Sequence, residues 1–256
     1  MPSGKQSKRK RRVQPPPPAR TRRRASPRVL IAAAAALVLI VVGIVLGVVL
    51  ASGDSSSAAG TRLADAAEVQ TLLKGIPQNG SVLGKASAPA TMVEYVDLQC
   101  PFCQQFETQS LPTLLSKYVR TGKLKLEARP VAIRGPDSAR GQSAAIAAGM
   151  QNKMFNFMQL LYDNQGVENS GWLNDSIVKS AAVSIPGLDV NRFLGDITSS
   201  AVDDKVSTVN DQSTADGLAY TPTILVGKTG SELHLVNVPS ATDPSPVVAA
   251  IDAALR

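Results

Sequence analysis

The chain has 256 residues, of which 44% are hydrophobic and 4% aromatic, enough for one sizeable domain with appendages. Its net charge of +7 is unevenly spread, because residues 1–28 hold 11 of the 27 basic residues and no acidic residue. The 16 basic and 20 acidic residues that follow give the rest of the chain a net charge of −4. The excess of positive charge therefore lies in the N-terminal tail, and we expect no nucleic-acid partner.

Residues 1–28, rich in arginine, lysine and proline, cannot bury a core, and we expect a disordered tail. Val29–Ala51 follows as 23 residues without a charged side chain. As a helix, this run would be about 34 Å long, enough to cross a bilayer. Because basic flanks stay in the cytoplasm, we expect a single-pass signal anchor in the cell membrane, with a cytoplasmic tail and an extracytoplasmic C-terminal part. Cleavage as a signal peptide near Ala51–Ala59 is the alternative, although this apolar run is longer than usual for one.

Residues 52–75 are rich in glycine, serine and alanine at first and then show a short helical pattern, so we expect a linker followed by a short helix. The folded domain is predicted to cover residues 76–256, with a turn at 75–80 and a short edge strand at 81–84.

The most informative stretch is Met92–Cys103. An apolar, β-favouring run at Met92–Val96 leads into Cys100-Pro-Phe-Cys103, and a helical pattern follows to about Tyr118. Cys100 would then lie at a helix N-terminus, where free N–H groups and the helix dipole favour a thiolate. Cys103, one turn later, could form a disulfide with Cys100. The pattern indicates a redox-active dithiol.

Two other interpretations of the cysteines are weaker. A structural disulfide this short would restrict the unfolded chain very little. A zinc site normally needs four ligands, whereas the chain has two cysteines and one histidine, His234. We therefore expect no metal and no cofactor.

The remaining elements follow in an order that indicates the fold. Lys123–Arg129 alternates polar and apolar residues, as a half-buried strand does. After the break at Gly135-Pro136, helical patterns fill the chain to residue 216; they cover 138–164, 172–183, 190–197 and 199–216. Strands at 221–227 and 232–238 and a helix at 244–256 complete the domain. The order β-α-β, helical block, β-β-α predicts an α/β, thioredoxin-like fold with a helical insertion at about residues 136–216.

Three separate segments make the chain resemble the DsbA family of extracytoplasmic thiol–disulfide oxidoreductases, in its membrane-anchored bacterial form. They are Val93–Cys103 with the dithiol, Gln151–Tyr162 at the expected start of the insertion, and Tyr220-Thr-Pro-Thr223. The resemblance implies that Cys100 is the attacking thiol, which forms a mixed disulfide with the substrate. Cys103 would be the buried partner that resolves or re-forms that bond.

The resemblance also implies roles for residues around the dithiol. Glu94 matches the family's buried acid, which could relay a proton to or from Cys103; an outward-facing residue on an edge strand is the alternative. Pro222 resembles the family's cis-proline, which would let the Thr221 backbone pair with an extended substrate. An ordinary trans proline opening an edge strand is the alternative for Pro222. Phe102, the third expected substrate-binding residue, stands where the best-known DsbA proteins have histidine.

The expected function is an enzyme that donates disulfides to exported cysteine-containing proteins. The family implies a quinone-linked membrane partner that re-oxidises the dithiol, and we expect a monomer. Two alternatives stay open: a disulfide reductase or isomerase with the same dithiol, and a non-catalytic anchored peptide-binding domain.

Overall fold

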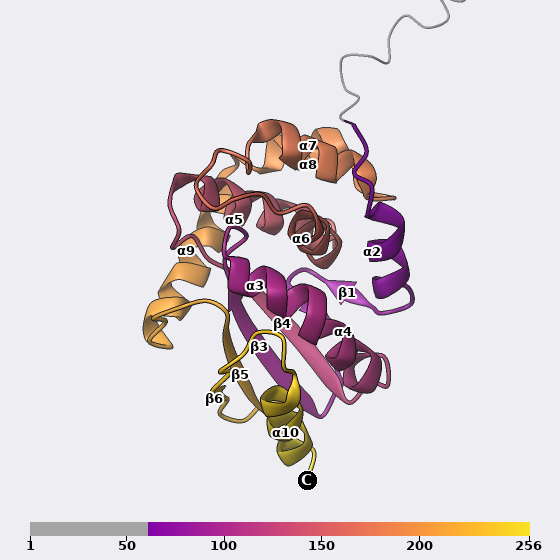
Figure 1. Cartoon of the computed structure of the whole chain (residues 1–256), viewed down its shortest axis with the longest axis vertical. Helices are drawn as coiled ribbons and strands as arrows, with labels where there is room; N and C mark the ends of the chain where they lie inside the picture. The colour runs from indigo at the N-terminus through magenta and orange to yellow at the C-terminus, as the bar shows by residue number, and fades with distance from the viewer. Residues whose placement is uncertain (1–60) are drawn as a thin grey trace, which may run out of the picture. The chain divides into compact units, whose positions relative to one another are not determined.

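The computed structural model describes residues 61–256 (Figure 1). The predicted tail at 1–28 and the predicted anchor at Val29–Ala51 lie outside the described residues. Among residues 61–256, no helix is long and apolar enough to cross a membrane.

In the described part of the chain, six strands form one mixed sheet in the order β1-β2-β4-β3-β5-β6. β3 pairs in parallel with β4, and the other neighbours are antiparallel. The strands are β1 (Gln78–Asn79), β2 (Val82–Leu83), β3 (Ala90–Val96), β4 (Leu124–Pro130), β5 (Thr223–Lys228) and β6 (His234–Val236).

The helical segments of the same region begin with α2 (Ala66–Leu73). A continuous helix follows β3 and contains two π-helical stretches: α3 (Pro101–Gln105), η1 (Phe106–Ser110), α4 (Leu111–Leu114) and η2 (Leu115–Val119). The insertion between β4 and β5 consists of α5 (Pro136–Gly149), α6 (Met154–Asp163), α7 (Asp175–Ser184), α8 (Val190–Asp196) and α9 (Ser200–Ala215). The chain ends with α10 (Ser245–Ala254). The predicted order of elements is confirmed.

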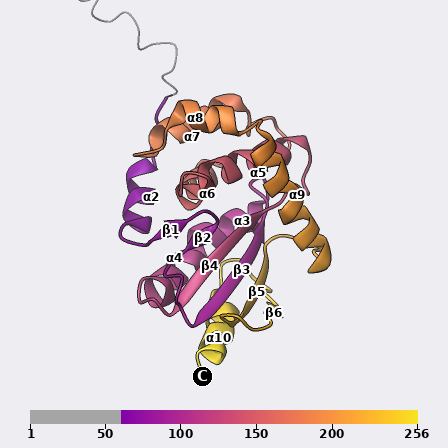
Figure 2. The ribbon, with the colours of Figure 1, turned by 180° about the vertical axis from the view of Figure 1, so that it is seen from behind.

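The sheet separates two groups of helices because β3 is apolar on both faces. Met92 and Val96 belong to the main core, whereas Val93 and Tyr95 form a second cluster on the other face, with Val209 of α9 against it. In Figure 1, α3, α4 and α10 lie in front of the sheet, and in Figure 2, seen from behind, the strands and α9 come forward. All seven residues of β3 are buried, so this strand is the centre of the domain.

The long helix predicted at 138–164 is wrong, since the structure has two helices, α5 and α6, with a turn between them. Asn152 adopts the left-handed conformation at φ 59° and cannot continue a right-handed helix. Its side-chain oxygen accepts a hydrogen bond from the Gly80 N–H at 2.9 Å. The tertiary contact to the β1–β2 turn thus stabilises a break that the amphipathic pattern does not show.

The predicted domain start at residue 76 is too late. Val69 and Leu73 of α2 are buried and belong to the main core. The Arg120 guanidinium, at the end of the helix that begins with α3, donates to the carbonyls of Leu72 and Lys74 at 2.5 and 2.7 Å. α2 is therefore part of the folded domain and not of a linker.

Candidate active site

Cys100 and Cys103 lie at the start of the helix that follows β3. Cys100 has extended backbone angles (φ −73°, ψ 119°), and Pro101 takes the first helical position, where its missing N–H costs nothing. The Cys100 N–H donates to the Asp97 carbonyl at 3.0 Å, and the Cys100 carbonyl accepts from Gln104 N–H at 3.1 Å. The helix therefore begins directly after Cys100, as the sequence predicts.

Both cysteines are free thiols, and both are buried. A hydrogen bond from the Cys103 thiol contributes most to lowering the pKa of Cys100, which falls to about 5 although burial opposes the change. Thr221 and the backbone N–H groups of Cys103 and Phe102 lower this pKa further. Cys100 is therefore a thiolate at neutral pH.

Cys103 has the opposite character. Burial, followed by its interaction with Cys100, raises the pKa of Cys103 well above its usual value. One member of the pair thus carries the negative charge while the other keeps its proton. This difference is the one expected if Cys100 is the attacking thiol and Cys103 keeps its proton.

Glu94 lies on β3 with its side chain fully buried, between β4 and β5, so the alternative of an edge-strand residue is wrong. Neither carboxyl oxygen has a hydrogen-bond partner among the described residues. Burial, and then repulsion from Glu107, raises the pKa of Glu94 well above its ordinary value. Burial therefore favours the protonated form of this carboxyl, which can then serve as a proton donor.

Glu107 of η1 is a site residue that sequence reasoning missed. It is fully buried, and the Gln159 side-chain amide donates a hydrogen bond to its carboxyl group. Burial raises the pKa of Glu107 to about 8. Its position four residues after Cys103, on the same helical face, was the one available signal. The charges of Cys103, Glu107 and Glu94 all act on the buried Tyr162 hydroxyl, so these acidic groups share one buried region.

The predicted substrate-binding residues come together beside the dithiol. The Thr221–Pro222 peptide bond is cis, as the resemblance implied. The Cys100 sulfur lies 3.4 Å from the Thr221 carbonyl oxygen. Phe102, Thr221 and Pro222 all line a cavity of about 400 Å³, which is completed by Gln105, Arg134, Tyr220 and residues 238–241.

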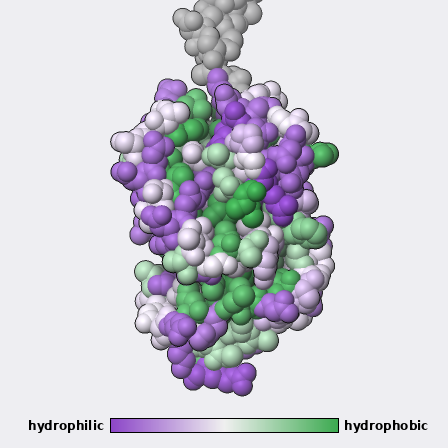
Figure 3. Space-filling model, turned by 90° about the vertical axis from the view of Figure 1, so that its left-hand side faces the viewer, coloured by the Kyte–Doolittle hydropathy of each residue, from purple (hydrophilic) through white to green (hydrophobic). Residues whose placement is uncertain are grey.

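Two aromatic side chains that line this cavity are also exposed to solvent, Phe102 at 57% and Tyr220 at 49%. Hydrophobic side chains reach the surface elsewhere too, for example at Val167 and Leu235. Figure 3 shows hydrophobic residues gathered in patches on one face, among hydrophilic ones.

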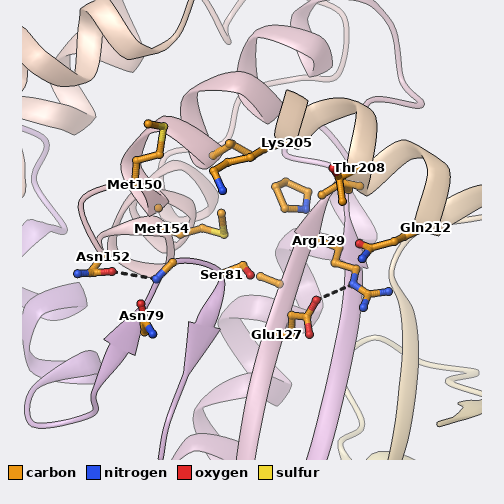
Figure 4. Close-up of a pocket in the computed structure, with 16 residues that line it drawn as sticks. Asn79, Ser81, Glu127, Arg129, Met150, Asn152, Met154, Lys205, Thr208 and Gln212 are labelled. Atoms are coloured by element: carbon orange, nitrogen blue, oxygen red, sulfur yellow. Dashed lines mark hydrogen bonds and ion pairs between the residues drawn. The ribbon is translucent and has the colours of Figure 1, made fainter. Parts of the chain in front are cut away.

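A second cavity, of about 520 Å³, lies between β4, α5, α9 and the turn at 79–81 (Figure 4). Arg129, one of its cations, is paired with Glu127 at 2.8 Å and with Asp216 at 3.1 Å. None of the predicted site residues lines this cavity. The dithiol and the cavity beside it are therefore the candidate active site.

The site has one thiol with a lowered pKa and one with a raised pKa, three residues apart, after a central strand and next to a cis-proline. This arrangement defines a thiol–disulfide oxidoreductase.

A family model described as "Thioredoxin" matches residues 77–235. The chain is 30% identical to the probable disulfide bond formation protein D of Bacillus cereus over 147 residues, 56% of this chain and 68% of that protein. It is 24% identical to disulfide bond formation protein D of Bacillus subtilis over 164 residues, 63% of this chain and 72% of that one.

Among solved structures, oxidised BdbD from Bacillus subtilis matches with a TM-score of 0.61 and 20% identity, over 77% of this chain and 98% of that chain. This likeness supports the thioredoxin-like α/β fold with a helical insertion, which is confirmed. The chain belongs to the DsbA family of thioredoxin-fold protein-disulfide oxidoreductases. The non-catalytic alternative is thereby set aside.

The hydrogen bond from Cys103 can be tested through the pKa of Cys100. The pH dependence of Cys100 alkylation in the reduced protein should have its midpoint at about pH 5. Cys103→Ala removes the donor and should move this midpoint upward, toward the free value of about 8.5. Cys103→Ser, the matched control, keeps a hydroxyl donor and should stay nearer the wild-type midpoint. Identical midpoints in wild type and Cys103→Ala would contradict this account of the thiolate.

The buried carboxyl pair predicts a pH dependence of stability. Because the folded-state pKa of Glu107 (about 8) is raised above the unfolded value of about 4.3, the folded protein binds more protons. Stability should therefore fall as the pH rises from about 5 to 8, by about 1.4 kcal/mol per pH unit for each proton retained. Glu107→Gln should flatten the curve by at least one proton's contribution, because it also removes the repulsion that helps to raise the pKa of Glu94.

The free energy of unfolding should be measured by denaturant titration on the disulfide-bonded form, so that the thiols do not titrate. Asp163, whose pKa burial raises to about 6, titrates in the same range and its charge also raises the pKa of Glu107, so the comparison is repeated in an Asp163→Asn background. The exposed Glu232→Gln is the control and should leave the slope unchanged. Equal slopes in wild type and Glu107→Gln would show that this carboxyl is ionised in the folded protein.

Proposed function

We propose that this protein is an extracytoplasmic oxidase, which donates the Cys100–Cys103 disulfide to exported cysteine-containing proteins. The observation that carries the proposal is the unequal ionisation of the two thiols, with a pKa of about 5 for Cys100 and a strongly raised pKa for Cys103. A stabilised thiolate favours the reduced form of the dithiol. The disulfide is therefore the stronger oxidant.

The reaction begins when a substrate thiolate attacks the Cys100 sulfur of the disulfide. The Cys100–Cys103 bond breaks, and Cys103 leaves and takes up a proton, for which the protonated Glu94 is the predicted donor. A second substrate thiolate then attacks the substrate sulfur of the mixed disulfide and expels Cys100 as a thiolate. The substrate dithiol has lost two electrons and two protons; one proton is retained on the Cys103 side and the other goes to solvent.

Substrate binding in this proposal uses the cavity beside the dithiol. An extended segment would pair with the backbone at Thr221 and place apolar side chains against Phe102 and Pro222. The Thr221 carbonyl, which contacts the Cys100 sulfur, would bring the substrate backbone next to the reacting bond.

The cellular setting is proposed from the sequence. Val29–Ala51 would anchor the chain, with residues 1–28 in the cytoplasm and the catalytic domain outside. Disulfide donation is useful in such an oxidising compartment. A quinone-linked membrane protein, implied by the family, would restore the disulfide, and the catalytic domain would act as a monomer.

A reductase or isomerase is the second candidate, favoured by Phe102, which cannot stabilise a thiolate by charge as histidine can. Equilibration of the purified domain with glutathione separates the two. Potentials in the wider family run from about −270 mV for thioredoxin to about −120 mV for DsbA, and we expect a value in the upper half of that range. The oxidised domain should also form disulfides in a reduced, unfolded secreted protein. Cys100→Ser should abolish this activity, while a potential at or below about −250 mV would favour the reductase.

The proposed topology is tested separately. Protease added to intact spheroplasts should digest the catalytic domain and spare an epitope tag placed at the N-terminus. The same protease added after detergent should digest both. A domain that resists protease until detergent is added would place it in the cytoplasm and end the extracytoplasmic proposal.

A further inference from the structure

The dithiol lacks the positive charge that a histidine between its cysteines could supply. Phe102 occupies that part of the sequence, and its ring is largely exposed. His234, the chain's only histidine, lies on the exposed strand β6. A cation beside Cys100 would therefore have to come from another segment of the chain.

Arg134, in the loop between β4 and α5, reaches the reactive sulfur. Its Nη2 atom lies 3.8 Å from Cys100 Sγ, within hydrogen-bond range for sulfur. Its Nη1 atom lies 3.8 Å from Glu168 Oε1, and the Arg134 side chain is 33% exposed. Its Nε atom is buried and has no hydrogen-bond partner in the part of the chain that the structure describes. The guanidinium thus lies between the Cys100 sulfur and the Glu168 carboxylate, and its Nε–H group is not used by either.

The backbone at Arg134 is fixed by the segment that carries the dithiol. One carboxyl oxygen of Asp97 accepts from the N–H groups of Ile133 and Arg134, at 2.9 and 3.0 Å. The Asp97 carbonyl accepts from the Cys100 N–H at 3.0 Å. A single buried residue therefore holds both the cysteine and the arginine, so their proximity is built into the fold.

We propose that Arg134 is a catalytic residue, whose guanidinium stabilises the Cys100 thiolate and so raises the oxidising strength of the disulfide. An opposite charge at this distance favours the ionised form of a titrating group by roughly one pKa unit or more. Because the Arg134 side chain is partly exposed, solvent screens the interaction, and the effect belongs at the low end, roughly tenfold.

The positive charge of Arg134 acts on the step in which the mixed disulfide between Cys100 and the substrate breaks. When a thiolate attacks the substrate sulfur of the mixed disulfide, the electron pair of the cleaved S–S bond passes to Cys100. No proton is transferred to Cys100, and Arg134 neutralises the thiolate that leaves. In the reverse direction the same thiolate is the nucleophile, so the inference rests on dithiol exchange and not on the proposed direction.

The test compares Arg134→Gln, Arg134→Lys and the control Arg192→Gln. Arg192 is an exposed arginine of α8, paired with Asp196, so its replacement changes net charge equally without touching the dithiol. Two quantities are measured for each protein: the midpoint pH of Cys100 alkylation and the equilibrium constant with glutathione at pH 7. The backbone hydrogen bonds to Asp97 remain in every variant, and circular dichroism checks the fold.

Arg134→Gln should raise the midpoint by about one pH unit and make the disulfide about tenfold less oxidising, equivalent to about 30 mV. Arg134→Lys, which keeps the charge, should retain most of both values, and Arg192→Gln should change neither. The two shifts must agree, because both report the same thiolate stabilisation. An unchanged midpoint in Arg134→Gln, with or without a change in the equilibrium constant, would overturn the proposal. The direction of catalysis is read from the absolute wild-type potential, so the two proposals fail independently.

Discussion

The buried carboxyl group of Asp97 holds together the segments that make the active site. One oxygen accepts from the Gln99 N–H at 2.9 Å and the Ser138 hydroxyl at 2.7 Å, and the other accepts from the N–H groups of Ile133 and Arg134. These bonds join the end of β3, the loop after β4 and the start of α5. A buried carboxyl needs such partners, since an unpaired one would be costly. The hydrogen bonds that satisfy Asp97 hold the loop that carries Arg134 next to the dithiol.

Around this centre the protein concentrates negative charge on one sulfur. Cys103, Glu94 and Glu107 lie in a buried region where desolvation opposes ionisation, and all three have raised pKa values. Cys100 differs because donors converge on it, and its pKa falls to about 5. The same burial that keeps protons on its neighbours therefore makes the Cys103 thiol a donor to Cys100. Burial therefore raises the pKa values of Cys103, Glu94 and Glu107 directly, and it supports the low pKa of Cys100 by keeping the proton on the Cys103 thiol.

Features that depend on local sequence patterns were predicted correctly, whereas features that depend on contacts between distant residues were not. The central strand was predicted correctly from its continuous apolar, β-favouring run. The helix after Cys100 and the helical character of the insertion were predicted correctly from their apolar periods. The continuous helix at 138–164 was wrong, since Asn152 breaks it through a bond to Gly80, 72 residues away. The role of α2 was underestimated because its burial depends on packing against α6, which its short pattern does not reveal.

By itself the sequence determined the dithiol, since Cys100 and Cys103 are one helical turn apart and the strand and helix around them are local patterns. It also determined Glu94, Thr221 and Pro222 as candidates, but only through likeness to a family. The tertiary structure decided which groups surround the sulfur: the Thr221 carbonyl is 121 residues from Cys100 in the chain, and the Arg134 guanidinium is 34 residues away. Such contacts leave no periodic signal, because they arise when the loops after β4 and before β5 meet at the end of β3 where the dithiol begins.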